Sequence, residues 1–90
     1  MLYTIRLRPK AEKQFAKLTS RDQERMTEAF DALAANPFRG KKLQGEYEGR
    51  YTLRVWPYRI VYVIERQILE VVILKIGHRQ GVYNEYSGIL

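Results

Sequence analysis

The chain has 90 residues, enough for one domain (residues 1–90) with a single modest core. It contains no cysteine, which excludes disulfides and thiolate metal sites and fits a reducing cytoplasm. Sixteen Lys and Arg against ten Asp and Glu give a net charge of +6, which favours an acidic or nucleic-acid partner. No apolar run approaches the ~20 residues of a membrane span, so we expect no membrane partner.

The first part of the chain predicts a strand and then a helix. Residues Leu2–Arg8 alternate between apolar and polar side chains, which is typical of a half-buried strand. Pro9 suits the first turn of a helix, because its missing N–H would have no partner there. The apolar stripe of this helix recurs at helical spacing and consists of Ala11, Phe15 and Leu18.

A second helix is predicted directly after the first. Thr19 and Ser20 separate the two, and Ser20 with Gln23 forms a potential capping box. Asn36 and Pro37 stop the second helix. Its apolar positions repeat the helical spacing and are Met26, Phe30 and Leu33. The two helices are therefore expected to form a hairpin that packs on a sheet.

The second half of the chain predicts a loop followed by three strands. The loop spans Phe38–Gly49, and the strands span Arg50–Val55, Tyr58–Glu65 and Ile68–Ile76. The tight turn at Arg66 and Gln67 implies antiparallel pairing. The expected fold class is α+β, with two layers and the order β-α-α-β-β-β: a helical hairpin on a small, mainly antiparallel sheet.

Both faces of the last strand are largely apolar. One face carries Leu69, Val71 and Ile73, and alternation places Val72, Leu74 and Ile76 on the other. Two helices can cover only one face of a sheet, and antiparallel sheets usually leave the other face polar. We therefore expect the second face to be covered by the chain's own tail, Val82–Leu90, or by a partner protein.

The common enzyme constellations are missing. The single histidine, His78, has no cluster of carboxylates around it, so we expect neither a metal nor another cofactor. No glycine-rich phosphate loop precedes a helix, and Ser20 and Ser87 lack a nucleophile motif. Glu46 and Glu48 lie in a glycine-flanked loop and are read as solvated.

Three arginines are the remaining candidates for chemistry. Arg54, Arg59 and Arg79 can converge on one sheet face if their strands are neighbours, and arginine binds phosphate bidentately. Tyr83 could then stack on a base. The alternative stays open at this point: the arginines are solvated, His78 is a turn residue, and Tyr83 and Tyr86 pack a terminal turn.

Four short motifs, in order, carry a family resemblance. They are "KLQG" before the second strand, "LR" within it, "YRIVY" in the third, and "GHR" followed by "VY" after the fourth. With these motifs the chain resembles the RelE branch of the RelE/ParE toxin superfamily over nearly its whole length. The resemblance implies the toxin of a type II toxin–antitoxin pair, an endoribonuclease that cuts mRNA in the ribosomal A site without a metal. In that reaction the ribose 2′-hydroxyl attacks the adjacent phosphate and leaves a 2′,3′-cyclic phosphate.

The resemblance also implies roles for single residues. Arg59 and Arg79 steady the phosphate, Tyr83 helps to place the base or the leaving group, and Arg54 matches the arginine of "LR". The expected RNA contacts are Lys41, Lys42, Arg50 and Tyr86.

The chain departs from the family pattern just before "LR". A well-known member has two lysines there, one of them proposed as general base, whereas this chain has Arg50 and Thr52. Arginine is a poor base because its pKa stays above ~12. Histidine is a residue type that can accept a proton near neutral pH, so His78 is one replacement, and Tyr83 is the other.

The partners implied by the resemblance are the ribosome with its mRNA and a co-encoded, acidic, RelB-like antitoxin. Two other functions stay open. One is a ParE-like toxin that inhibits DNA gyrase, and the other is an inactive homologue that binds only an antitoxin or RNA.

Overall fold

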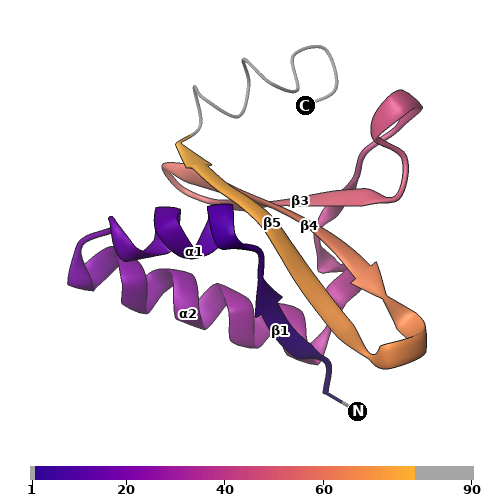
Figure 1. Cartoon of the computed structure of the whole chain (residues 1–90), viewed down its shortest axis with the longest axis horizontal. Helices are drawn as coiled ribbons and strands as arrows, with labels where there is room; N and C mark the ends of the chain where they lie inside the picture. Colours follow the sequence, from indigo (N-terminus) through magenta and orange to yellow (C-terminus); the bar gives the residue numbers. More distant parts are fainter. Residues whose placement is uncertain (1, 79–90) are drawn as a thin grey trace.

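The computed structural model describes residues 2–78, which form two helices on one side of a five-stranded sheet (Figure 1). The strand order is β1-β5-β4-β3-β2, with β1 parallel to β5 and every other neighbouring pair antiparallel. The elements are β1 (Thr4–Leu7), α1 (Pro9–Ala16), α2 (Ser20–Ala35), β2 (Lys41–Lys42), β3 (Arg50–Val55), β4 (Tyr58–Glu65) and β5 (Glu70–His78). The predicted α+β class and element order are confirmed.

The two helices meet at a capped junction. Thr19 caps α2, because its hydroxyl oxygen accepts a hydrogen bond from the Asp22 amide at 3.2 Å. The predicted capping box of Ser20 and Gln23 is therefore wrong by one residue. The Gln23 side chain instead donates to the Phe15 carbonyl at 3.0 Å, which ties α2 to α1.

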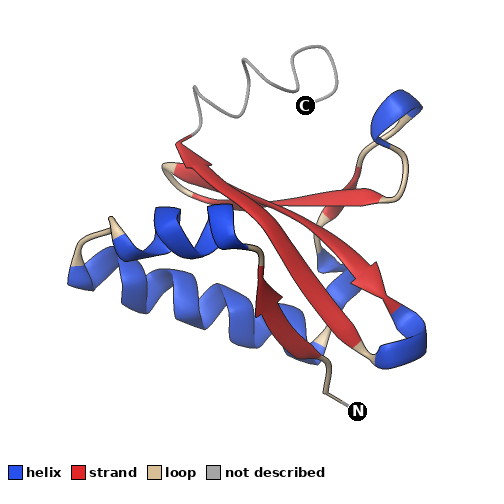
Figure 2. Ribbon diagram, viewed as in Figure 1, coloured by secondary structure: helices blue, strands red, loops and turns tan. Residues whose placement is uncertain are grey.

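The main core lies between the helices and the side of the sheet that we call the helix face. Its buried residues are Ala11, Met26, Phe30, Leu33, Tyr51, Ile60, Tyr62, Val71, Ile73 and Ile76. Burial of each large apolar side chain contributes about 1.5–3 kcal/mol. Figure 2 shows both helices against this one face, so the helices leave the opposite face of the sheet uncovered.

The opposite side of the sheet, which we call the open face, carries Thr52, Arg54, Arg59 and Val61. A smaller buried cluster of Leu43 and Val61 lies here. The expectation that the helices cover only one face is confirmed. The other face was expected to be covered by the tail, Val82–Leu90, or by a partner protein, and the tail lies outside the described residues.

Two parts of the sheet differ from the prediction. The expected loop Phe38–Gly49 contains β2, a two-residue strand too short to show periodicity. The turn before β5 is longer than expected, because Arg66–Ile68 form a 3₁₀ turn and Leu69 takes a left-handed conformation with φ of 55°. The last strand therefore begins at Glu70 and ends at His78, two residues later than predicted.

A β-bulge in β5 changes which side chains share a face. Val61 pairs with Lys75 but Tyr62 pairs with Ile73, so β5 has one extra residue at this point. Strict alternation placed Ile76 with Val72 and Leu74. The bulge instead places Ile76 in the main core, so this detail of the prediction is wrong. Every β5 residue after the bulge likewise lies on the face opposite to the one that strict alternation predicts.

Candidate nucleic-acid interface

Strand register brings two of the predicted arginines together. Arg54 of β3 lies directly opposite Arg59 of β4, and Arg59 lies opposite Gly77 of β5. Directly opposed residues in an antiparallel pair have Cβ atoms about 4.5–5.5 Å apart, and like charges in that arrangement are destabilising. Because the two cations repel each other, binding of an anion such as a phosphodiester between them would be favourable.

The two arginines differ in exposure. Arg59 is only 8% exposed, whereas Arg54 is exposed. Arginine is seldom buried to this degree. The β5 residue opposite Arg59 is Gly77, which has no side chain. We call the opposed pair Arg54 and Arg59 the arginine row. Arg59 is thus the buried cation of the pair, and Arg54 is the exposed one.

Other predicted RNA contacts are divided between the two faces. Lys41 pairs with Thr52 and is exposed on the open face. Arg50 shares that face but lies four residues from Arg54, about 13 Å along the strand, and its guanidinium lies 5.6 Å from the centre of the Tyr47 ring. Lys42 pairs with Tyr51 and therefore belongs to the helix-face side.

The structure does not bring His78 onto the open face. The bulge in β5 puts His78 opposite Tyr58 on the helix-face side, with the two rings edge to face and their centres 6.0 Å apart. Alternation without a bulge would have placed it with the arginines. Arg79, Tyr83 and Tyr86 lie outside residues 2–78, so their predicted roles stay predictions.

Thr52 occupies one of the positions where the family resemblance led us to expect a lysine. It is only 2% exposed, and within residues 2–78 its hydroxyl has no hydrogen-bond partner. A buried threonine offers no accessible group for proton transfer. Across the same described range, no three His, Asp or Glu side chains come together as potential metal ligands.

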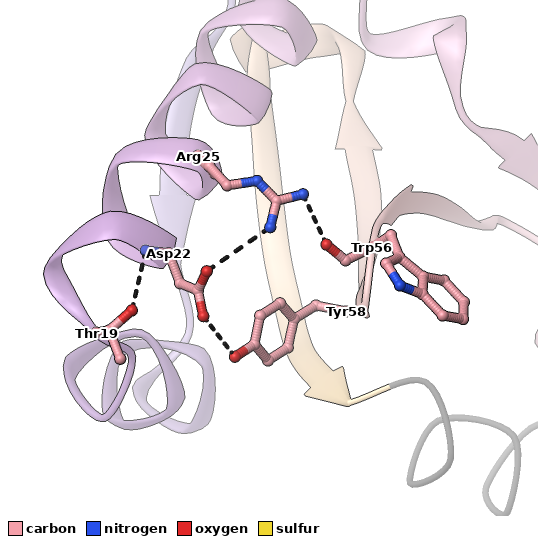
Figure 3. A network of polar contacts seen from close by, with 5 residues as sticks. All are labelled: Thr19, Asp22, Arg25, Trp56 and Tyr58. Atoms are coloured by element: carbon pink, nitrogen blue, oxygen red, sulfur yellow. Dashed lines mark hydrogen bonds and ion pairs between the residues drawn. The ribbon is translucent and has the colours of Figure 1, made fainter.

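A polar cluster that the sequence did not reveal holds the turn between the two arginine strands (Figure 3). The Tyr58 hydroxyl donates to Asp22 Oδ2 at 2.9 Å, and Arg25 Nη1 lies 3.7 Å from Asp22 Oδ1. Arg25 Nη2 donates to the Trp56 carbonyl at 2.6 Å. The hydrogen bond to Asp22, followed by burial, raises the pKa of Tyr58. We call Asp22, Arg25, Tyr58 and the Trp56 carbonyl the turn clamp.

The only sequence signal for the turn clamp was the spacing of Asp22 and Arg25, which places them on one side of a helix. Their partners lie more than thirty residues away along the chain. Such a contact becomes visible only when the fold is known.

No helix among residues 2–78 has the length and apolarity needed to cross a membrane.

Comparison with known proteins supports the reading of the motifs. Residues 5–83 match the family described as "ParE toxin of type II toxin-antitoxin system, parDE". Toxin RelG of Mycobacterium tuberculosis is 36% identical over 85 residues, which cover 92% of this chain and 98% of that protein.

Solved structures agree with the sequence matches. The toxin–antitoxin complex RelBE2 from M. tuberculosis contains a chain with a TM-score of 0.81 and 36% identity, covering 88% of this chain and 100% of that one. A mutant E. coli toxin RelE in complex with a peptide of its antitoxin RelB has a TM-score of 0.74 and 27% identity, with both chains fully covered. The chain therefore belongs to the RelE/ParE family of toxins from type II toxin–antitoxin systems.

Proposed function

We propose that this toxin acts in the cytoplasm as a ribosome-dependent endoribonuclease that cleaves mRNA in the A site and so stops translation. The observation that carries the proposal is the row of Arg54 and Arg59 on the open face, with Arg59 buried. Two guanidiniums on neighbouring strands match the non-bridging oxygens of one phosphodiester. The family resemblance supplies the reaction type.

The reaction needs charge stabilisation more than it needs a covalent group from the protein. The ribose 2′-oxygen attacks phosphorus, the bond from phosphorus to the 5′-oxygen breaks, and the products are a 2′,3′-cyclic phosphate and a free 5′-hydroxyl. One proton leaves the 2′-hydroxyl and one is added to the 5′-oxygen. Negative charge grows on the phosphate oxygens, where prearranged cations lower the barrier most. Arg54 and Arg59 are assigned this role.

The reaction also needs a proton acceptor for the 2′-hydroxyl. Thr52 is buried and position 50 carries an arginine, a residue type that is a poor base, so neither replaces a lysine base. His78 and Tyr83 are the two candidates. His78 is exposed at the end of β5, next to Gly77, the residue opposite Arg59, although its side chain belongs to the other face. A folded His78→Gln variant that still binds ribosomes but loses cleavage would favour histidine as the base.

The antitoxin partner is proposed to bind the open face. This face combines the arginine row with the apolar cluster around Leu43 and Val61. A segment with both acidic and apolar side chains would neutralise the arginine row and bury the apolar cluster. The similarity to chains solved in complex with their antitoxins supports an antitoxin as the partner, and the charge and apolar cluster of the open face are the reasons for placing it there. Binding there would also block access to the arginine row.

The test is cleavage of a defined mRNA on programmed ribosomes. Purified toxin is added with excess EDTA, naked RNA serves as control, and the new 5′ ends are mapped. Cuts confined to the A-site codon, on ribosomes only and despite EDTA, are expected. Cuts that need added metal, or that appear equally on naked RNA, would contradict the proposed mechanism.

A second candidate function is inhibition of DNA gyrase. The matching family description names ParE, and the two branches share one fold. A supercoiling assay separates the branches, because a gyrase inhibitor blocks supercoiling and leaves ribosome-bound mRNA intact. A folded protein that does neither, yet binds an antitoxin, would be the inactive homologue.

A further inference from the structure

The turn between β3 and β4 presents a large aromatic side chain beside the arginine row. Trp56 is the only tryptophan of the chain and is 54% exposed. It follows Arg54 by two residues, which corresponds to about 7 Å along a strand. Arg59 follows it by three. The exposed indole is therefore close enough to the site that we assign to the phosphate to contact the base of an adjacent nucleotide.

The turn clamp fixes the backbone that carries this indole. The Trp56 carbonyl is bound by Arg25 at 2.6 Å, and on the other side of Pro57 the Tyr58 hydroxyl is bound to Asp22 at 2.9 Å. Figure 3 shows the carbonyl directed toward α2 and the indole directed away from the turn clamp. A side chain on a held turn loses less entropy when it binds a ligand.

We propose that Trp56 stacks on an unpaired nucleobase adjacent to the phosphate held by Arg54 and Arg59. This rests on the proposed function and adds a residue that selects and holds the substrate. Proteins that bind single-stranded nucleic acid combine cationic groups with exposed aromatic rings, and every base offers a face for stacking. An exposed tryptophan could equally contact a protein, but the two neighbouring arginines favour a nucleotide.

The contact is tested directly by photocrosslinking. Programmed ribosomes carry an mRNA with 5-iodouridine in the A-site codon and 2′-O-methyl groups that block the attack. After toxin binding and irradiation, the crosslinked peptide is identified by mass spectrometry. A crosslink at Trp56 is expected. A toxin that binds these ribosomes but crosslinks only through residues away from the β3–β4 turn would overturn the inference.

Kinetics test whether the contact contributes to the reaction. Trp56→Ala should lower kcat/KM about 5- to 150-fold, the range expected for one stacked base. Most of the loss should appear in KM, and Trp56→Phe should restore most of it while Trp56→Leu should not. The matched control is Ile68→Ala, because Ile68 is another exposed apolar residue, with 62% exposure, and lies at the opposite end of the sheet.

The two proposals fail in different ways. If wild-type protein makes no cuts, the proposed function is wrong, and the crosslink still reports whether Trp56 contacts a base. If wild type cleaves and Trp56→Ala, still folded, cleaves equally well, the stacking inference is wrong and the proposed function stands.

Discussion

Tyr62 is fully buried, and its hydroxyl is hydrogen-bonded on two sides. It donates to the Pro37 carbonyl at 2.8 Å and accepts from the Gly40 amide at 3.1 Å. Burial disfavours the phenolate and raises the pKa of Tyr62 to about 12, although the Gly40 amide acts in the opposite direction. This single side chain holds the segment after α2 against the sheet.

The raised pKa of Tyr62 predicts a loss of stability in alkali. Unfolded tyrosine releases its proton near pH ~10, whereas the folded protein retains it to about 12. The native state therefore binds more protons between these values. The contribution is fully present below pH ~10 and is lost as pH rises to about 12, at up to ~1.4 kcal/mol per pH unit. Urea unfolding measured across this range should show a shallower decline for Tyr62→Phe. Identical slopes would contradict the assignment.

Gly40 is predicted to tolerate no side chain. A Cβ atom there would press on the Tyr62 hydroxyl and lie 2.7 Å from the Thr52 carbonyl oxygen. Gly40→Ala should lower the free energy of unfolding by about 1–3 kcal/mol, as overpacking does. Gly45→Asn is the control, because Gly45 has φ of 66° and open space around it, and asparagine accepts that conformation. Equal unfolding energies for both variants would disprove the steric argument.

At the scale of elements, α2 determines where the β3–β4 turn lies. Asp22 and Arg25 lie one helical turn apart and hold Tyr58 and Trp56 on the two sides of Pro57. Because β3 and β4 carry Arg54 and Arg59, the same contacts stabilise the end of the hairpin where the arginine row lies. Contacts of α2 on the helix face thus stabilise the end of the hairpin that carries the arginine row.

Removing one hydroxyl tests this coupling. Tyr58→Phe should lower the free energy of unfolding by about 1 kcal/mol, because Asp22 loses one hydrogen bond but stays partly solvated. Denaturant unfolding measures the effect. Tyr3→Phe is the matched control, since Tyr3 packs against the same core and its hydroxyl makes no hydrogen bond within residues 2–78. The change for Tyr3→Phe should stay below about 0.5 kcal/mol. A larger loss for Tyr3→Phe than for Tyr58→Phe would refute the role of the turn clamp.

At the scale of the molecule, the sequence predicted the element order and the bounds of β3 and β4, because apolar spacing and turn residues are local signals. It missed β2, which is two residues long, and the bulge in β5. A bulge leaves no mark on composition, yet it reverses the facing of every later residue in its strand. This explains why Ile76 was assigned to the wrong face and why His78 does not share a face with Arg54 and Arg59.

The sequence also predicted part of the candidate site. The residues Arg54 and Arg59 followed from motif and alternation, and the register then showed that they are directly opposed. Burial of Arg59 and the clamp on Trp56 depend on contacts between distant segments, so no local pattern could reveal them.

The central claim is that the arginine row is the phosphate site of an mRNA-cleaving toxin. Its most direct test is the single-turnover cleavage rate on programmed ribosomes for Arg59→Ala and Arg54→Ala. The control is Arg6→Ala, an exposed arginine on the same face that pairs with Glu70 at 3.0 Å. Thermal unfolding of each variant shows that it is folded, and Arg54 is the exposed member whose loss leaves the core intact.

The account predicts at least a ~100-fold lower rate for each row variant, as for loss of one transition-state donor, and an unchanged rate for Arg6→Ala. Folded row variants that cleave at the wild-type rate would show that the phosphate is held elsewhere.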